Sequence, residues 1–167
     1  MSNSNAPTPP NPLTLLMPVV NGTSVQTLLT LISQNQAAID AALTNIGTVH
    51  FARFLVLDTS VPNLQPASLT TASNLVLAVI TEYDGSFASY ISDFVGQLAQ
   101  VFNALLSYVV GGSAVVPVQN NPTAFQNFVQ ANDASQNPAA PALYCAYPYT
   151  VQTILADCGS TASGAGA

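Results

Sequence analysis

The spacing of apolar residues along the chain predicts three helices. Residues 24–46 carry apolar side chains at helical spacing, and Gly47 follows where a helix would end. Residues 87–108 repeat this pattern and run up to a pair of glycines at 111–112. A shorter helix is predicted to open at Asn121-Pro122, because Asn caps helices and Pro suits the first turn.

Short runs of aliphatic, aromatic and β-branched residues predict four strands, at 13–20, 48–57, 75–83 and 142–147. Pro18 places the first of these at a sheet edge or a strand end, because proline has no amide hydrogen to donate. With the helices, the order is strand, helix, strand, strand, helix, short helix, strand. This order indicates an α+β fold with ferredoxin-like split βαβ topology, a four-stranded antiparallel sheet, two long helices and an inserted short helix.

The predicted strands do not alternate apolar and polar residues, as strands with one solvated face normally do. In the second strand, one face would carry His50, Ala52, Phe54 and Val56, and the other Val49, Phe51, Arg53, Leu55 and Leu57. Both faces are mostly apolar, and residues 75–80 behave in the same way. A face without helices would expose more apolar surface than a monomer usually tolerates. We therefore expect a second copy of the chain to cover it.

Three segments resemble a known superfamily. They are VHFARFLVLD at 49–58, TEYDGSFASYISDF at 81–94 and LYCAYPYTVQTIL at 143–155. These segments are similar to parts of small dimeric α+β-barrel proteins of the ferredoxin-like superfamily, and the resemblance extends over most of residues 13–155. Members include haem enzymes, small monooxygenases and proteins without known activity. The resemblance implies a fold and a dimer rather than one activity.

The composition divides the chain into three parts. Residues 1–12, MSNSNAPTPPNP, are rich in Pro, Asn and Ser and are predicted to form an extended N-terminal arm. Residues 13–158 are predicted to form a single ferredoxin-like domain, which suits a chain of 167 residues. Residues 159–167 are predicted to be a flexible Gly, Ser and Ala tail.

Charge is scarce in this chain and excludes several partners. Only 5% of residues are charged, against about 25% in typical proteins. The chain has no Lys and one Arg, so it cannot supply the several cations that nucleic acid requires. Residues 1–11 contain no cation, so no secretory signal is recognisable, and no apolar run is long enough for a transmembrane segment. Cys145 and Cys158 could be bridged or reduced.

The candidate catalytic residues are His50, Arg53, Glu82 and Asp84. A lone His in a barrel could bind haem or act as a general base, and it could equally be a hydrogen-bonded structural residue. Arg53 could bind a substrate, or it could pair with Asp58, Glu82 or Asp84. Glu82 and Asp84 could form a carboxylate pair, although the following glycine makes Asp84 typical of a turn or cap. The sequence has no metal-site spacing of Cys and His.

Two functions follow from these observations. The first is a structural, self-assembling protein without enzymatic activity or cofactor, which contacts copies of itself through the open sheet face and the N-terminal arm. Such a low-charge, acid- and protease-resistant homo-oligomer would suit a filament, sheath or shell that is extracellular or at the cell surface. The alternative is a small-molecule or haem-binding dimeric α+β-barrel enzyme that uses His50 and Arg53.

The charge deficit predicts an unusual tolerance of acid, salt and trypsin. Acid unfolding arises mainly from titration of paired carboxylates and repulsion among cations, and this chain has few of either. We expect circular dichroism to show neither unfolding at about pH 3 nor strong salt dependence. Trypsin has only Arg53 to cut, so most of the assembly should survive digestion. Cooperative acid unfolding would contradict this prediction.

Overall fold

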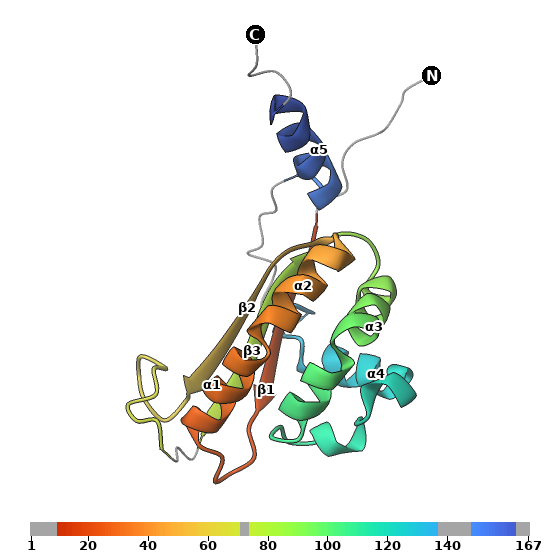
Figure 1. Ribbon diagram of the computed structural model, residues 1–167. Helices are drawn as coiled ribbons and strands as arrows, with labels where there is room; N and C mark the ends of the chain where they lie inside the picture. Colours follow the sequence, from red (N-terminus) through yellow and green to blue (C-terminus); the bar gives the residue numbers. More distant parts are fainter. Residues whose placement is uncertain (1–9, 71–73, 137–147, 163–167) are drawn as a thin grey trace.

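The computed structural model describes residues 10–70, 74–136 and 148–162 and shows an α+β fold. Within these residues, one three-stranded antiparallel sheet is combined with five α-helices (Figure 1). The elements are β1 (Asn11–Pro18), α1 (Val25–Gln34), α2 (Gln36–Ile46), β2 (Val49–Asp58), β3 (Leu75–Tyr83), α3 (Phe87–Leu106), α4 (Pro122–Asn132) and α5 (Val151–Ala162).

The sheet has the strand order β1-β3-β2. β3 pairs antiparallel with both neighbours, so β1 and β2 run parallel to each other on either side of it. The connection between β1 and β2 is made by α1 and α2. The predicted sheet of four strands is corrected to three within the described residues. The predicted fourth strand, at 142–147, lies outside these residues.

The main core lies between one face of the sheet and the helices. Figure 1 shows α1, α2 and α3 on the same side of the sheet. Alternate side chains of the strands point toward these helices and are buried, because successive residues of a strand face opposite sides. These residues include Leu13, Leu15 and Met17 of β1 and Leu75, Leu77, Val79, Thr81 and Tyr83 of β3.

The predicted helix over 24–46 is two helices, separated at Asn35. Ser24 caps α1 by accepting a hydrogen bond from the Thr27 amide, and Gly47 ends α2 in the left-handed conformation with φ 64°. The Asn35 side chain donates to the carbonyl of Leu31 at 2.8 Å. Asn competes for helix carbonyls in this way, which explains why one apolar pattern yields two helices.

A row of aromatic rings joins β3 to α3 and α4. Tyr83 stacks on Tyr90 with ring centroids 4.0 Å apart, and the contacts continue through Phe94, Phe102 and Phe125. α4 begins at Pro122, as predicted, and contributes the fully buried Phe125 to this row. The aromatic row therefore packs α3 and α4 against the sheet.

A buried hydrogen bond links the sheet to α3 within this row. The hydroxyls of Thr81 and Tyr90 lie 2.8 Å apart, and both residues are almost fully buried. Burial raises the pKa of the Tyr90 phenol well above its ordinary value of 10.0. The pKa of Tyr83 is raised as well, first by burial and then by the nearby carboxylate of Asp133.

The raised pKa of Tyr90 predicts a loss of stability in alkali. The unfolded state loses the phenolic proton at about pH 10, whereas the folded state keeps it. The free energy of unfolding is therefore unaffected by this ionisation below about pH 10 and decreases above it. Urea unfolding between about pH 8 and pH 11 measures this slope. Tyr90→Phe should flatten the slope and cost about 1–3 kcal/mol at pH 8, because the Thr81 hydroxyl loses its partner. An unchanged slope would contradict this assignment.

Candidate functional site

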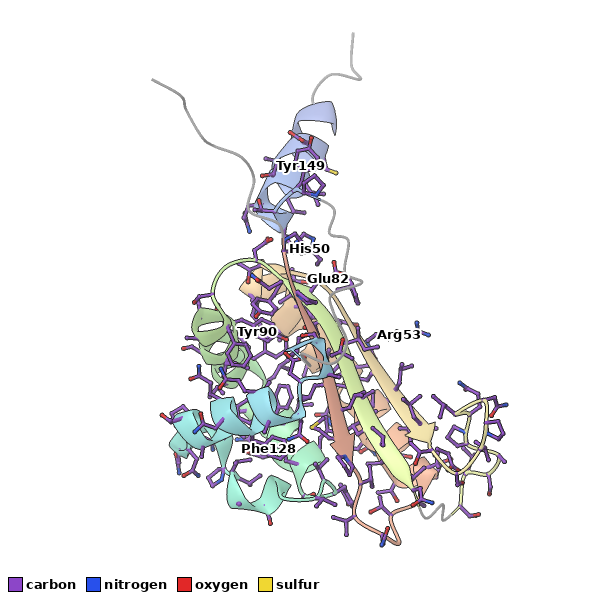
Figure 2. All side chains as sticks on the ribbon, turned by 180° about the vertical axis from the view of Figure 1, so that it is seen from behind. His50, Arg53, Glu82, Tyr90, Phe128 and Tyr149 are labelled. Carbon is purple, nitrogen blue, oxygen red and sulfur yellow. The ribbon has the colours of Figure 1, made fainter. Side chains whose placement is uncertain are left out.

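The sheet face turned away from the helices is the most distinctive surface of the molecule. We call it the open face. Figure 2 shows the molecule from this side, with α1 and α2 behind the strands and α3 beside them. The open face consists of Thr14, Leu16 and Pro18 of β1, Val76, Ala78, Ile80 and Glu82 of β3, and Phe51, Arg53, Leu55 and Leu57 of β2.

Strand register arranges these side chains in rows across the sheet. One row is Leu16, Ala78 and Leu55, and the next is Pro18, Val76 and Leu57. Both rows are entirely apolar. Leu16 is 37% exposed and Phe51 is 43% exposed, which is high for large hydrophobic side chains. No described helix from α1 to α4 lies across these rows in Figure 2.

Two charges lie at one end of this apolar face. Arg53 pairs in register with Ile80, and Glu82 pairs with Phe51. The two charged residues are therefore diagonal neighbours on adjacent strands. The described residues provide no salt bridge to Arg53, which is exposed.

The predicted ion pairs of Arg53 with Asp58, Glu82 or Asp84 are therefore absent from the described structure. Asp58 instead accepts hydrogen bonds from the amide and hydroxyl of Ser60.

His50 occupies a β-bulge at the start of β2. The register with β3 shifts between Val49, which is opposite Tyr83, and Phe51, which is opposite Glu82. A bulge changes the direction of the extra side chain, and here it also brings Val49 into the core. The predicted placement of Val49 on the same face as Phe51 was therefore wrong.

Asp84 connects His50 to α5. The His50 Nε2 atom lies 3.0 Å from one carboxylate oxygen of Asp84, and the amide of Val151 donates to the other oxygen at 2.8 Å. A carboxylate at the first amides of a helix is favourable, because these amides lack partners within the helix. Asp84 is thus a cap, but of α5. The side chain of Ser86 caps α3.

The four candidate residues do not form one catalytic centre. His50 and Asp84 meet at the end of the sheet next to α5, whereas Arg53 extends from the middle of β2 and Glu82 lies on the open face (Figure 2). Glu82 and Asp84 do not pair with each other, because Asp84 lies beyond the end of β3 and is bonded to His50 and Val151. The described part of the chain also has no cluster of three metal-ligating side chains.

The outer edge of β1 carries contacts that the sequence did not reveal. Asp133 accepts a hydrogen bond from the Thr14 amide at 3.0 Å, and the Ser135 hydroxyl donates to the carbonyl of Pro12. At the other end, the Val110 amide donates to the carbonyl of Pro18 at 2.9 Å. These contacts satisfy edge groups that would otherwise be available to another strand.

A polar pocket lies near the Asn11 end of β1 and is a second candidate site. It has a volume of about 320 Å³ and is lined by Asn11, Tyr83, Ser86, Gln130 and Asp133, with Gly85 and Phe87. Asp133 is already bonded to the amides of Thr14 and Ser135. The pocket therefore offers mainly neutral hydrogen-bonding groups, and none of the four candidate residues lines it.

Comparison of the chain with family models, with curated proteins and with solved structures found no match. None of the helices in the described ranges has the length and apolar character needed to cross a membrane.

The contacts of Asp84 predict that this carboxylate holds α5 to the sheet. Asp84→Ala removes the partner of His50 and of the Val151 amide, so we expect the free energy of unfolding to fall by about 1–3 kcal/mol. Hydrogen exchange should show faster exchange in α5. Asp93→Ala is the matched control, because Asp93 is exposed on α3. Equal effects of the two substitutions would contradict this role.

Proposed function

We propose that this protein is a structural, self-assembling homo-oligomer in which the open face of the sheet packs against a second copy of the chain. The single observation that carries the proposal is the pair of apolar rows on that face, which no helix from α1 to α4 covers. Removing large apolar side chains from water contributes about 25 cal/mol per Å². A second open face offers a surface of the same composition for that burial.

The finer fold assignment belongs to the same proposal. The order β1-β3-β2, with α1 and α2 joining the parallel strands β1 and β2, is the order expected for three strands of a ferredoxin-like split βαβ unit. Two such units packed through their sheets would form a dimeric α+β barrel. The fourth strand of that arrangement would normally pair beside β1, where Val110 and Asp133 now make contacts.

The low charge on the surface of α1 and α2 supports association beyond a dimer. Their exposed side chains are mostly uncharged polar residues, Ala and Leu29, with Asp40 as the single charge, so copies repel each other weakly. The predicted N-terminal arm could add to a neighbouring sheet by strand addition. Since β1 is occupied along its outer edge, the arm would pair with β2. A filament, sheath or shell outside the cell remains the proposed setting.

The haem or small-molecule alternative receives no support from the geometry of its two key residues. The His50 Nε2 atom is bonded to Asp84, and Arg53 extends from another part of β2 on the open face. A Soret band after reconstitution with haem, lost in His50→Ala, would establish this alternative instead.

Two leucine substitutions test association through the open face. Leu16 on the open face and Leu29 on α1 have nearly equal exposed fractions, 37% and 40%. We expect Leu16→Gln to weaken association at least tenfold, because it places a polar amide in the interface. Leu29→Gln should leave association unchanged. Sedimentation equilibrium measures both dissociation constants, and a monomeric wild-type protein would refute the proposal.

Imaging separates a dimer from a larger assembly. Electron microscopy of the wild-type protein should show a regular polymer, and removal of residues 1–9 should reduce it to dimers if the arm joins them. Discrete dimers in both samples would refute the polymer and the role of the arm, while leaving association through the open face intact.

A further inference from the structure

Among the described residues of the open face, one cation and one anion lie close together without forming a salt bridge with each other. Arg53 and Glu82 are diagonal neighbours on β2 and β3, a relation that places such residues roughly 7–8 Å apart. Ile80 and Phe51, their partners in register, are apolar. The described residues supply no salt bridge to either charge.

Covering this face would be costly if the two charges stayed unpaired. Burying a charge without a partner strongly opposes association, whereas opposite charges that meet across an interface offset much of that cost. A partner for this face must therefore present an anion opposite Arg53 and a cation opposite Glu82. Another open face presents both of them.

A two-fold axis brings these charges together in a simple way. Consider an axis that lies in the interface, passes midway between Arg53 and Glu82, and is perpendicular to the line that joins them. Rotation about this axis exchanges the two positions, as required for an isologous interface. The line from Arg53 to Glu82 runs diagonally to the strands, so the axis is oblique to them as well. Rotation about this axis therefore makes the strands of the two sheets cross at a steep angle, as in orthogonal sheet packing.

We propose that two copies dock through their open faces so that Arg53 of each copy forms a salt bridge with Glu82 of the other. This inference rests on the proposed association through the open face, and it adds the register and symmetry of the interface. The apolar rows supply the general attraction. The two reciprocal salt bridges select one orientation among those that bury the same apolar area.

Charge reversal with mixing of variants tests this interface directly. Arg53→Glu leaves two anions on the open face, and Glu82→Arg leaves two cations. Each variant alone should show a dimer dissociation constant at least a hundredfold higher than wild type, because like charges then face each other. An equimolar mixture should form a heterodimer with affinity near that of wild type, because each Glu then meets an Arg across the interface.

Mixing distinguishes contacts between copies from a contact within one copy. If Arg53 paired with Glu82 of its own chain, both single variants would lose that pair, and mixing would restore nothing. Asp93→Arg is the control for the change in net charge, because Asp93 is exposed on α3. This control should form the wild-type dimer and should not form heterodimers preferentially with Arg53→Glu.

The outcomes separate this inference from the function on which it rests. A wild-type dimer without restoration in the mixture, or single variants that dimerise as tightly as wild type, overturns the reciprocal salt bridges but leaves association through the open face standing. A monomeric wild-type protein overturns both. Circular dichroism first checks that the variants are folded.

A neutral set of variants provides the same test if a charge reversal prevents folding. The set consists of Arg53→Met, Glu82→Gln and the double variant. For reciprocal salt bridges, the double variant should dimerise more tightly than either single variant, because no unpaired charge is left in the interface. Additive effects on the dissociation constant would overturn the inference.

Discussion

The apolar character of both faces of β3 is the constraint on which the rest of the structure depends. As the central strand, β3 bonds to β1 and β2 along its length and sends alternate side chains to the helices and to the open face. Its residues on the helix side reach the core of α1, α2 and α3. Its residues on the other side, including the fully buried Ala78, leave an apolar surface that the helices cannot reach.

Because the chain has few charges, its apolar open face is poorly protected against association with other copies. A typical protein surrounds an exposed apolar surface with Lys and Glu, which keep copies apart. Here, the one Arg lies on the apolar face itself, next to one Glu. The hydrogen-bonded pair of His50 and Asp84 lies at the end of the sheet, where Asp84 also binds the first amide of α5, and it takes no part in the open face. The few charges therefore have separate structural tasks.

The sequence predicted elements with a strong apolar pattern well. β3 has the predicted bounds 75–83, and the predicted helix end at Gly47 is confirmed. Of the two residues able to cap the helix start, Thr23 and Ser24, the structure uses Ser24, because capping depends on local residue chemistry. β1 begins at Asn11, two residues before the predicted start, since its pairing with β3 extends into the Pro-rich segment. The break at Asn35 escaped prediction because Ile32 and Ile39 are seven residues apart and keep the helical phase, although polar Asn35 interrupts the apolar stripe between them.

The candidate site was less predictable because its geometry depends on contacts between distant residues. A bulge at His50 leaves no signature in composition, yet it decides which way the start of β2 faces. The bond of Asp84 to Val151 joins residues 67 positions apart. The apolar character of both sheet faces was visible in the sequence, because the strands lack alternation. The lack of a salt bridge between Arg53 and any other described residue was not visible, since pairing is decided by register.

The two edges of the sheet differ in a way that bears on how copies could join end to end. The outer edge of β1 is bonded to Asp133, Ser135 and Val110, whereas no described strand pairs with the outer edge of β2. In the proposed assembly, an incoming strand would therefore pair with β2. A chain of copies linked by such strands would have direction, with one end that receives the next subunit and another that does not.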